Sequence, residues 1–78
     1  MIKLRKGYKS MRMLIVEDEK ELCDTISKSL YESGYEVDTC YDGHEALDYI
    51  LTEDYDLIVL DLNLPGMDGM DILRELRK

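Results

Sequence analysis

The sequence has no tryptophan and no phenylalanine, and it has one proline and one histidine. Its two cysteines, Cys23 and Cys40, stand at neither a metal-ligand nor a redox spacing. Two such cysteines are typical of reduced thiols in a cytoplasmic protein, and a disulfide framework is therefore not expected. No apolar run approaches the roughly 20 residues that a membrane-spanning helix needs, so a membrane protein is not expected either.

Positive charge is scarce in the body of the chain. Between Met13 and Leu73 the only cations are Lys20 and Lys28, and the formal net charge of the whole chain is -8. An acidic surface repels phosphate backbones, so direct nucleic-acid binding is not expected, whereas a cation such as Mg²⁺ or a basic partner fits. Positive charges gather in residues 1–12 instead, which we interpret as a basic N-terminal extension before one small domain at residues 13–78.

The apolar pattern alternates between that of strands and that of helices. Strands are expected at residues 13–16, 35–40 and 57–60, of which the first and third are apolar throughout. Helices are expected at residues 20–33, from a cap at Asp42 to a break at Asp54, and from about residue 70 to residue 77. The apolar stripes of the first two helices are Leu22, Cys23, Ile26 and Leu30, and Ala46, Leu47, Ile50 and Leu51.

This order of elements predicts an α/β fold. Strands that are separated by helices pair in parallel, with right-handed crossovers. The two apolar strands are expected to be neighbours, and the second strand, which alternates with acids, is expected at an edge. The prediction is a parallel three-stranded sheet in the order 2-1-3 with β-α-β-α-β-α connectivity.

Acidic residues follow both apolar strands at the point where each strand ends. Glu17 and Asp18 follow the first strand, and Asp61 follows the third. Neighbouring parallel strands lie about 4.8 Å apart and end at one edge of the sheet, so we expect the three carboxylates to converge. Such a cluster suits Mg²⁺, which offsets the repulsion when an aspartate attacks a phosphoryl group. Asp61 is the expected nucleophile; the alternative is that these acids only cap helices or stay solvated.

Two segments carry a family resemblance. Residues 14–19 read LIVEDE and residues 57–69 read LIVLDLNLPGMDG, while Tyr41-Asp42-Gly43 and Ala46-Leu47 also fit. With these motifs, residues 13–78 resemble the receiver domain of bacterial response regulators, especially the winged-helix transcription-factor class. The resemblance implies the first part of a flavodoxin-like receiver fold in a cytoplasmic two-component system.

The same resemblance implies a role for individual residues. Asp61 matches the aspartate that accepts a phosphoryl group from a sensor histidine kinase. Asp18 matches a direct Mg²⁺ ligand, and Glu17 matches an acid that acts through metal-bound water. Asn63 matches the position whose backbone carbonyl completes the metal site, and Pro65 and Gly69 match residues that shape the adjoining loop.

The sequence also departs from the family pattern. Receiver domains continue with further strands, and the Ser/Thr and Lys that they place on those strands have no counterpart here. We therefore expect a receiver that is truncated after its third helix and whose phosphorylation switch is impaired. Its third strand is expected to be an open edge through which two copies pair, in the order 2-1-3-3-1-2, or exchange elements.

The leading functional prediction is a signalling module that accepts phosphate and is not an enzyme. One alternative is a fragment that takes no phosphate and acts only in binding or oligomerisation. Another is a Mg²⁺-dependent phosphohydrolase with an aspartyl nucleophile, which Asn63 disfavours because an amide cannot act as the general acid. The last alternative is a purely structural or designed half-domain.

Overall fold

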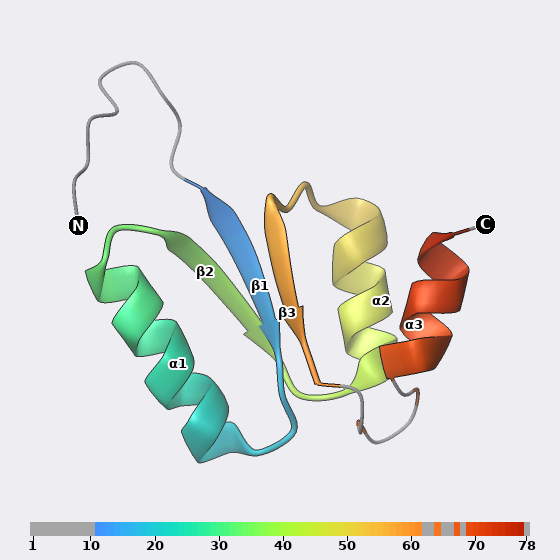
Figure 1. The fold of residues 1–78 in the computed structure, drawn as a ribbon, viewed down its shortest axis with the longest axis horizontal. Helices are drawn as coiled ribbons and strands as arrows, with labels where there is room; N and C mark the ends of the chain where they lie inside the picture. The colour runs from blue at the N-terminus through green and yellow to red at the C-terminus, as the bar shows by residue number, and fades with distance from the viewer. Residues whose placement is uncertain (1–10, 62–63, 65–66, 68, 78) are drawn as a thin grey trace.

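The computed structural model describes residues 11–61, 64, 67 and 69–77, which form three strands and three helices (Figure 1). In chain order these elements are β1 (Arg12–Val16), α1 (Lys20–Glu32), β2 (Glu36–Cys40), α2 (Gly43–Thr52), β3 (Leu57–Leu60) and α3 (Gly69–Leu76). The expected elements are all present, with ends displaced by a residue or so. Arg12, which we had assigned to the basic extension, begins β1.

The three strands form one parallel sheet in the order β2-β1-β3. The register places Leu14 of β1 beside Asp38 of β2 and beside Ile58 of β3. This confirms the predicted α/β architecture and its strand order. A central first strand follows from the sequence, because β1 is apolar at both of its faces and needs cover on both.

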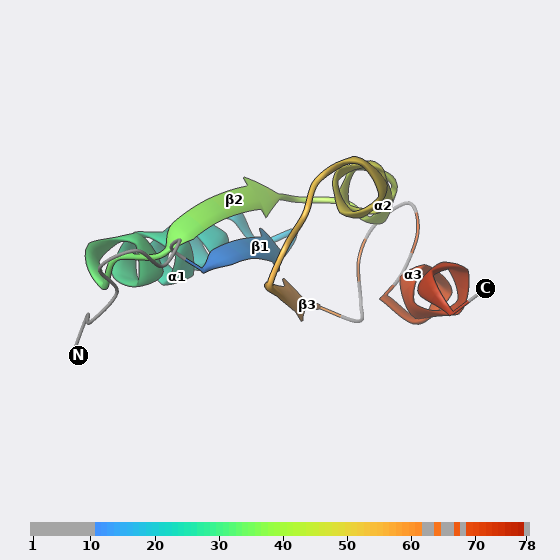
Figure 2. The ribbon, with the colours of Figure 1, turned by 90° about the horizontal axis from the view of Figure 1, so that it is seen from above.

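Helices cover both faces of the sheet. Figure 1 shows α1 on one side of the strands, and α2 and α3 on the other; Figure 2 shows α2 and α3 next to each other beyond β3. Leu14 and Ile15 of β1 have no exposed surface, because α2 and α3 lie on one side and α1 on the other. The larger core cluster lies on the side of α2 and α3 and comprises Leu14, Val16, Cys40, Ala46, Leu64 and Ile72.

Two residues of the expected apolar stripes lie outside the core. The side chains of Leu22 and Leu51 are 42% and 67% exposed. Successive residues of a helix are rotated by about 100°, so a helix that contacts a sheet along a narrow line buries only one of two adjacent residues. Cys23 takes that place in α1, since it is fully buried and its Sγ lies 3.9 Å from the carbonyl oxygen of Ile15.

A local signal sets the start of α2. The Asp42 side chain accepts a hydrogen bond of 2.9 Å from the backbone N–H of Glu45, which confirms the predicted cap of α2. Gly43, the first residue of α2, is fully enclosed: a Cβ there would lie 1.5 Å from the carbonyl oxygen of Met67. A side chain at residue 43 would therefore push the segment after β3 away from α2.

A charged cluster ties the strands together at the edge where they begin. The Arg12 guanidinium forms ion pairs with Asp38 at 3.2 Å and with Glu53 at 3.3 Å, and it lies 5.0 Å from the centre of the Tyr55 ring. The Tyr55 hydroxyl donates to Asp38 at 2.6 Å. These contacts explain why a cationic residue is tolerated at the start of β1. No helix in the described part of the chain is long and apolar enough to cross a membrane.

Candidate metal centre

Three acidic side chains meet at the edge where β1 and β3 end. Glu17 and Asp18 directly follow β1, and Asp61 directly follows β3. Each offers one carboxylate oxygen, and these oxygens all lie within 4.8 Å of one another. The expected convergence of the three acids is therefore present in the structure, and it follows from the parallel pairing of β1 with β3.

Backbone hydrogen bonds hold these residues in place. The N–H of Asp61 donates to the carbonyl of Val16 at 3.0 Å, and the N–H of Glu17 donates to the carbonyl of Cys40 at 3.1 Å. The strand pairing thus continues one residue past β1 and one past β3, so the first acid after each strand is still part of the sheet. Glu17 and Asp61 are half-buried and Asp18 is exposed, which leaves the cluster open to solvent on one side.

The carboxyl group of Glu17 has a raised pKa. The largest single influence lowers its pKa: the backbone N–H of Glu19 donates to it at 3.1 Å. Desolvation, a hydrogen bond with Asp18 and the negative charge of Asp61 act in the other direction and together outweigh that bond. Crowded carboxylates therefore make ionisation of Glu17 less favourable, which a bound cation would reverse.

The donor set fits a small hard cation. Carboxylate oxygens are the ligands that Mg²⁺ prefers, and Mg²⁺ usually takes one or two of them while it keeps several waters. The open side of the cluster leaves room for waters and for an incoming group. Two residues that the sequence pointed to, Asn63 and Pro65, lie outside the described residues, and Gly69 is a buried residue that begins α3.

Sequence reasoning missed two parts of this region. The first is the backbone N–H of Glu19, which orients the Glu17 carboxylate; no residue pattern signals it. The second is Gly43, whose lack of a side chain admits the carbonyl of Met67. A glycine directly after a capping aspartate, where Ser, Asp and Glu are ordinary choices, is a signal that could have indicated a close backbone approach.

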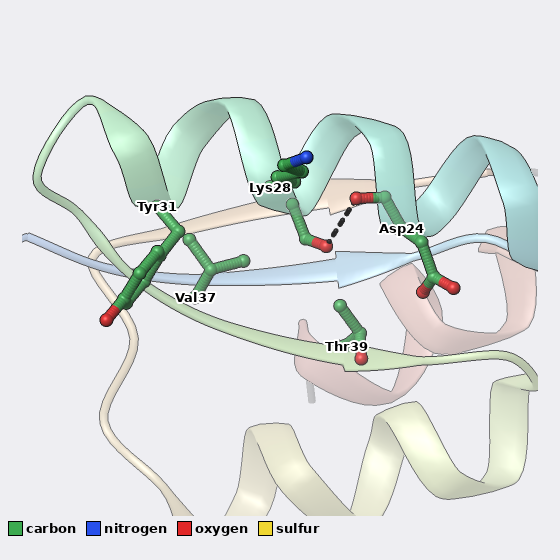
Figure 3. Close-up of a pocket in the computed structure, with 6 residues that line it drawn as sticks. Asp24, Lys28, Tyr31, Val37 and Thr39 are labelled. Atoms are coloured by element: carbon green, nitrogen blue, oxygen red, sulfur yellow. Dashed lines mark hydrogen bonds between the residues drawn. The ribbon is translucent and has the colours of Figure 1, made fainter.

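A shallow groove elsewhere on the surface contains none of the three acids. It has a volume of about 450 Å³ and lies between α1 and β2 (Figure 3). Its lining residues are Asp24, Ser27, Lys28, Tyr31, Val37 and Thr39. Because it shares no residue with the acidic cluster and mixes both charges with apolar groups, it does not compete with that cluster as the candidate centre.

Comparison with known proteins identifies similar sequences. The family model of the response regulator receiver domain matches residues 13–78. The chain is 47% identical over 68 residues to the regulatory protein VanRB of Enterococcus faecalis, and the match covers 87% of this chain and 31% of that protein. It is 46% identical to the transcriptional regulatory protein DltR of Streptococcus agalactiae, again over 87% of this chain and over 30% of that protein.

Solved structures show the same fold. The receiver domain of the Francisella response regulator 1452 superposes with a TM-score of 0.84 at 35% identity, covering 87% of this chain and 56% of that one. The response regulator TrrA of Thermotoga maritima, solved in complex with Mg²⁺-BeF, gives a TM-score of 0.80 at 39% identity, covering 86% and 58%. A second structure holds TrrA in complex with the histidine kinase ThkA. The chain thus spans about a third of these curated relatives and somewhat over half of these solved chains.

Proposed function

The chain belongs to the response regulator receiver domain family, and from this membership we propose that it accepts a phosphoryl group on Asp61 in a two-component signalling system. The observation that carries the proposal is the meeting of Glu17, Asp18 and Asp61 within 4.8 Å. A nucleophilic carboxylate needs a way to approach a negatively charged phosphoryl group, and two further acids that can hold a cation beside it supply one.

The chemistry assigned to Asp61 is a nucleophilic displacement. One of its carboxylate oxygens forms a bond to phosphorus while the bond from phosphorus to the donor breaks, and the bonding electrons leave with the donor. The product is an acyl phosphate. The backbone N–H of Asp61 donates to the carbonyl of Val16, which holds Asp61 beside Glu17 and Asp18, and Asp61 is only half-buried.

We propose Mg²⁺ as the cation and Glu17, Asp18 and Asp61 as side chains that hold it, with the backbone of Asn63 as a further ligand. When bound, the ion offsets the negative charge that gathers between the acceptor and the phosphoryl oxygens. The hard-oxygen donor set supports this choice, as does the Mg²⁺-BeF complex of the related TrrA. The backbone N–H of Glu19 donates to the Glu17 carboxylate, and this hydrogen bond orients the carboxylate for binding the ion.

A sensor histidine kinase is the proposed donor, and a cytoplasmic location follows from that partnership. Support comes from TrrA, a neighbour at 39% identity that was solved in complex with the histidine kinase ThkA. The other readings raised by the sequence, a binding-only fragment and a phosphohydrolase, gain nothing from the comparisons, because the matched relatives are regulatory proteins.

Self-association is a further prediction. In the described part of the chain β3 pairs only with β1, so it has the open edge that pairing between two copies needs. Sedimentation at several protein concentrations tests it. A single monomeric species at all micromolar concentrations would contradict pairing through β3.

Radiolabelled acetyl phosphate with Mg²⁺ tests the main proposal. The chain is expected to take up label, and Asp61→Asn is expected to remove it. Asp48→Asn is the matched control: it makes the same change on the exposed surface of α2 and should label normally. Absence of label from the unmodified chain, or label that survives in Asp61→Asn, would refute Asp61 as the acceptor.

A further inference from the structure

The strand β2 lies at an edge of the sheet and has one open side. Within the described residues it pairs only with β1. The N–H of Glu36 donates to the carbonyl of Met11, directly before β1, so Glu36 turns its backbone groups toward β1. Successive residues of a strand turn these groups in opposite directions, so those of Val37 and Thr39 face the open side. An added strand would pair with these two residues.

The side chains of β2 divide between two faces of different character. Val37 and Thr39 lie on the side of α1, where they line the shallow groove together with Tyr31 (Figure 3). Tyr31 is 71% exposed, so one wall of the groove is an uncovered aromatic ring. Glu36 and Asp38 alternate with these β2 residues and therefore belong to the opposite face. A strand that fits this edge must alternate apolar side chains for the groove with basic side chains for the two acids.

The chain itself contains a segment with this alternation. Residues 2–5 read Ile-Lys-Leu-Arg, and they lie outside the residues that the structure describes. One antiparallel register suits both faces of β2, and its pairs are Arg5–Glu36, Leu4–Val37, Lys3–Asp38 and Ile2–Thr39. Each basic residue then stands opposite an acid, and each apolar residue stands at the groove. A shift of the register by one residue would put the basic side chains in the groove instead.

The position of Met11 brings this segment within reach of the open side. Met11 accepts from Glu36 at the end of the sheet where β2 begins. A strand on the open side of β2 lies two strand spacings, or about 9.6 Å, from β1. Residues 6–10, at up to about 3.3 Å each, extend to about 16 Å, which is enough to pass the start of β2 and join an antiparallel strand to β1.

We propose that residues 2–5 dock on the open side of β2 as a fourth, antiparallel strand in this register. The two apolar side chains fill the groove between α1 and β2, and the two basic ones lie beside the acids on the other face. Docking gives backbone partners to β2 and blocks this edge against strands of other molecules. Ion pairs at a surface are weak and screened by salt, so high ionic strength releases the segment. The proposal does not depend on phosphate acceptance at Asp61.

Hydrogen exchange of backbone N–H groups, followed by NMR on the whole chain at low ionic strength, tests the docking. The N–H groups of Val37 and Thr39 should exchange at least about tenfold more slowly in the unmodified chain than in Arg5→Glu, which puts like charges opposite each other. Arg77→Glu makes the same change of charge after the end of α3 and should leave both rates unchanged. Combining Arg5→Glu with Glu36→Arg should restore slow exchange.

Disulfide formation tests the register and identifies which chain supplies the strand. Arg5→Cys with Glu36→Cys makes a directly opposed pair whose Cβ atoms lie about 4.5–5.5 Å apart, so mild oxidation should close a bond within one chain. Cys23 and Cys40 are buried and should not compete. Arg5→Cys with Asp48→Cys, which lies on the exposed surface of α2, should form no such bond.

Three results would overturn the proposal. The first is equal exchange at Val37 and Thr39 in Arg5→Glu and Arg77→Glu. The second is a disulfide that forms as readily with the cysteine at position 48 as with the one at position 36. The third is a disulfide that joins two chains, which would show that a second copy supplies the strand. Normal docking in Asp61→Asn, seen as unchanged exchange, would support its independence from phosphate acceptance, whereas loss of docking there would refute that independence.

Discussion

The backbone N–H of Asp61 donates to the carbonyl of Val16 at 3.0 Å. This single bond joins the residue after β3 to the last residue of β1, and Glu17 and Asp18 come next on that strand. The three carboxylates are thus held together by the sheet itself and not by the flanking loops. The consequences of this arrangement can be tested one residue at a time.

Removal of one carboxylate is expected to weaken Mg²⁺ binding. In Asp18→Asn the site loses a charged ligand while the shape of the side chain is kept, and we expect affinity to fall by at least about tenfold. Calorimetric titration of the chain with MgCl₂ measures it. Asp48→Asn, which removes an equal charge from α2 at a distance from the cluster, serves as the control. Equal affinity in Asp18→Asn and in the unmodified chain would contradict the role of Asp18.

The effect of Mg²⁺ on stability is expected to depend on pH. The pKa of Glu17 is raised because desolvation, Asp18 and Asp61 outweigh the bond from Glu19. In the metal-free protein the raised pKa contributes stability below the unfolded-state pKa of this group, and that stability is lost as pH rises through the folded-state pKa. Mg²⁺ binds the ionised form, so its stabilising effect is largest well above that pKa and falls as protons compete.

Thermal melts followed by circular dichroism, with and without Mg²⁺ at pH 7.5 and at pH 4.5, measure this dependence. We expect a clear rise in Tm with Mg²⁺ at the higher pH and a small rise or none at the lower one. A rise of equal size at both values would show that ionisation of the cluster does not govern metal binding. The samples without Mg²⁺ also lack Ca²⁺ and are kept at the same ionic strength as those with Mg²⁺. This controls for general screening of charges by salt.

Gly43→Ala is expected to destabilise the protein. The added Cβ would lie 1.5 Å from the carbonyl oxygen of Met67, so the backbone on one side must move. Displacements of this kind cost about 1–3 kcal/mol of the free energy of unfolding. Urea denaturation measures the change, and His44→Ala, at the next and exposed position of α2, is the control. A Gly43→Ala protein as stable as the control would mean that the segment after β3 has room to shift.

The cluster at the opposite edge of the sheet is expected to make the protein sensitive to high pH. Desolvation, followed by the bond to Asp38 and the charge of that carboxylate, raises the pKa of Tyr55 above its ordinary value. Desolvation also raises the pKa of the Cys40 thiol, which lies at the end of β2 and outside this cluster, to about 12. The unfolded chain therefore loses these protons first. The stability that they contribute is full below about pH 9 for Cys40 and below about pH 10 for Tyr55, and it is lost as pH rises further.

Tyr55→Phe isolates the part of this sensitivity that comes from the tyrosine. At pH 7 the variant should lose about 0.5–1.5 kcal/mol, because the hydroxyl no longer donates to Asp38. Between pH 9 and pH 11 its stability should fall less steeply than that of the unmodified protein. Tyr31→Phe, on the exposed surface of α1, should behave like the unmodified protein. A parallel fall in Tyr55→Phe and Tyr31→Phe would assign the dependence to other groups.

The sequence by itself determined the order and type of the elements, the parallel sheet and the meeting of Glu17, Asp18 and Asp61. These follow from short-range patterns, since the apolar runs mark the strands and a strand's direction sets where its last residue lies. The capping of α2 by Asp42 is equally local and was also predicted.

Only the tertiary structure decided which apolar residues are buried and which backbone segments touch. Leu22 and Cys23 are adjacent and both apolar, yet the position of α1 over β1 buries one and exposes the other. Leu57 and Val59 stay bare because no described helix lies over β3 on that face, and the approach of Met67 to Gly43 joins segments far apart in the chain. Burial depends on neighbours that are distant in sequence, and the local periodicity of apolar residues does not determine where those neighbours lie.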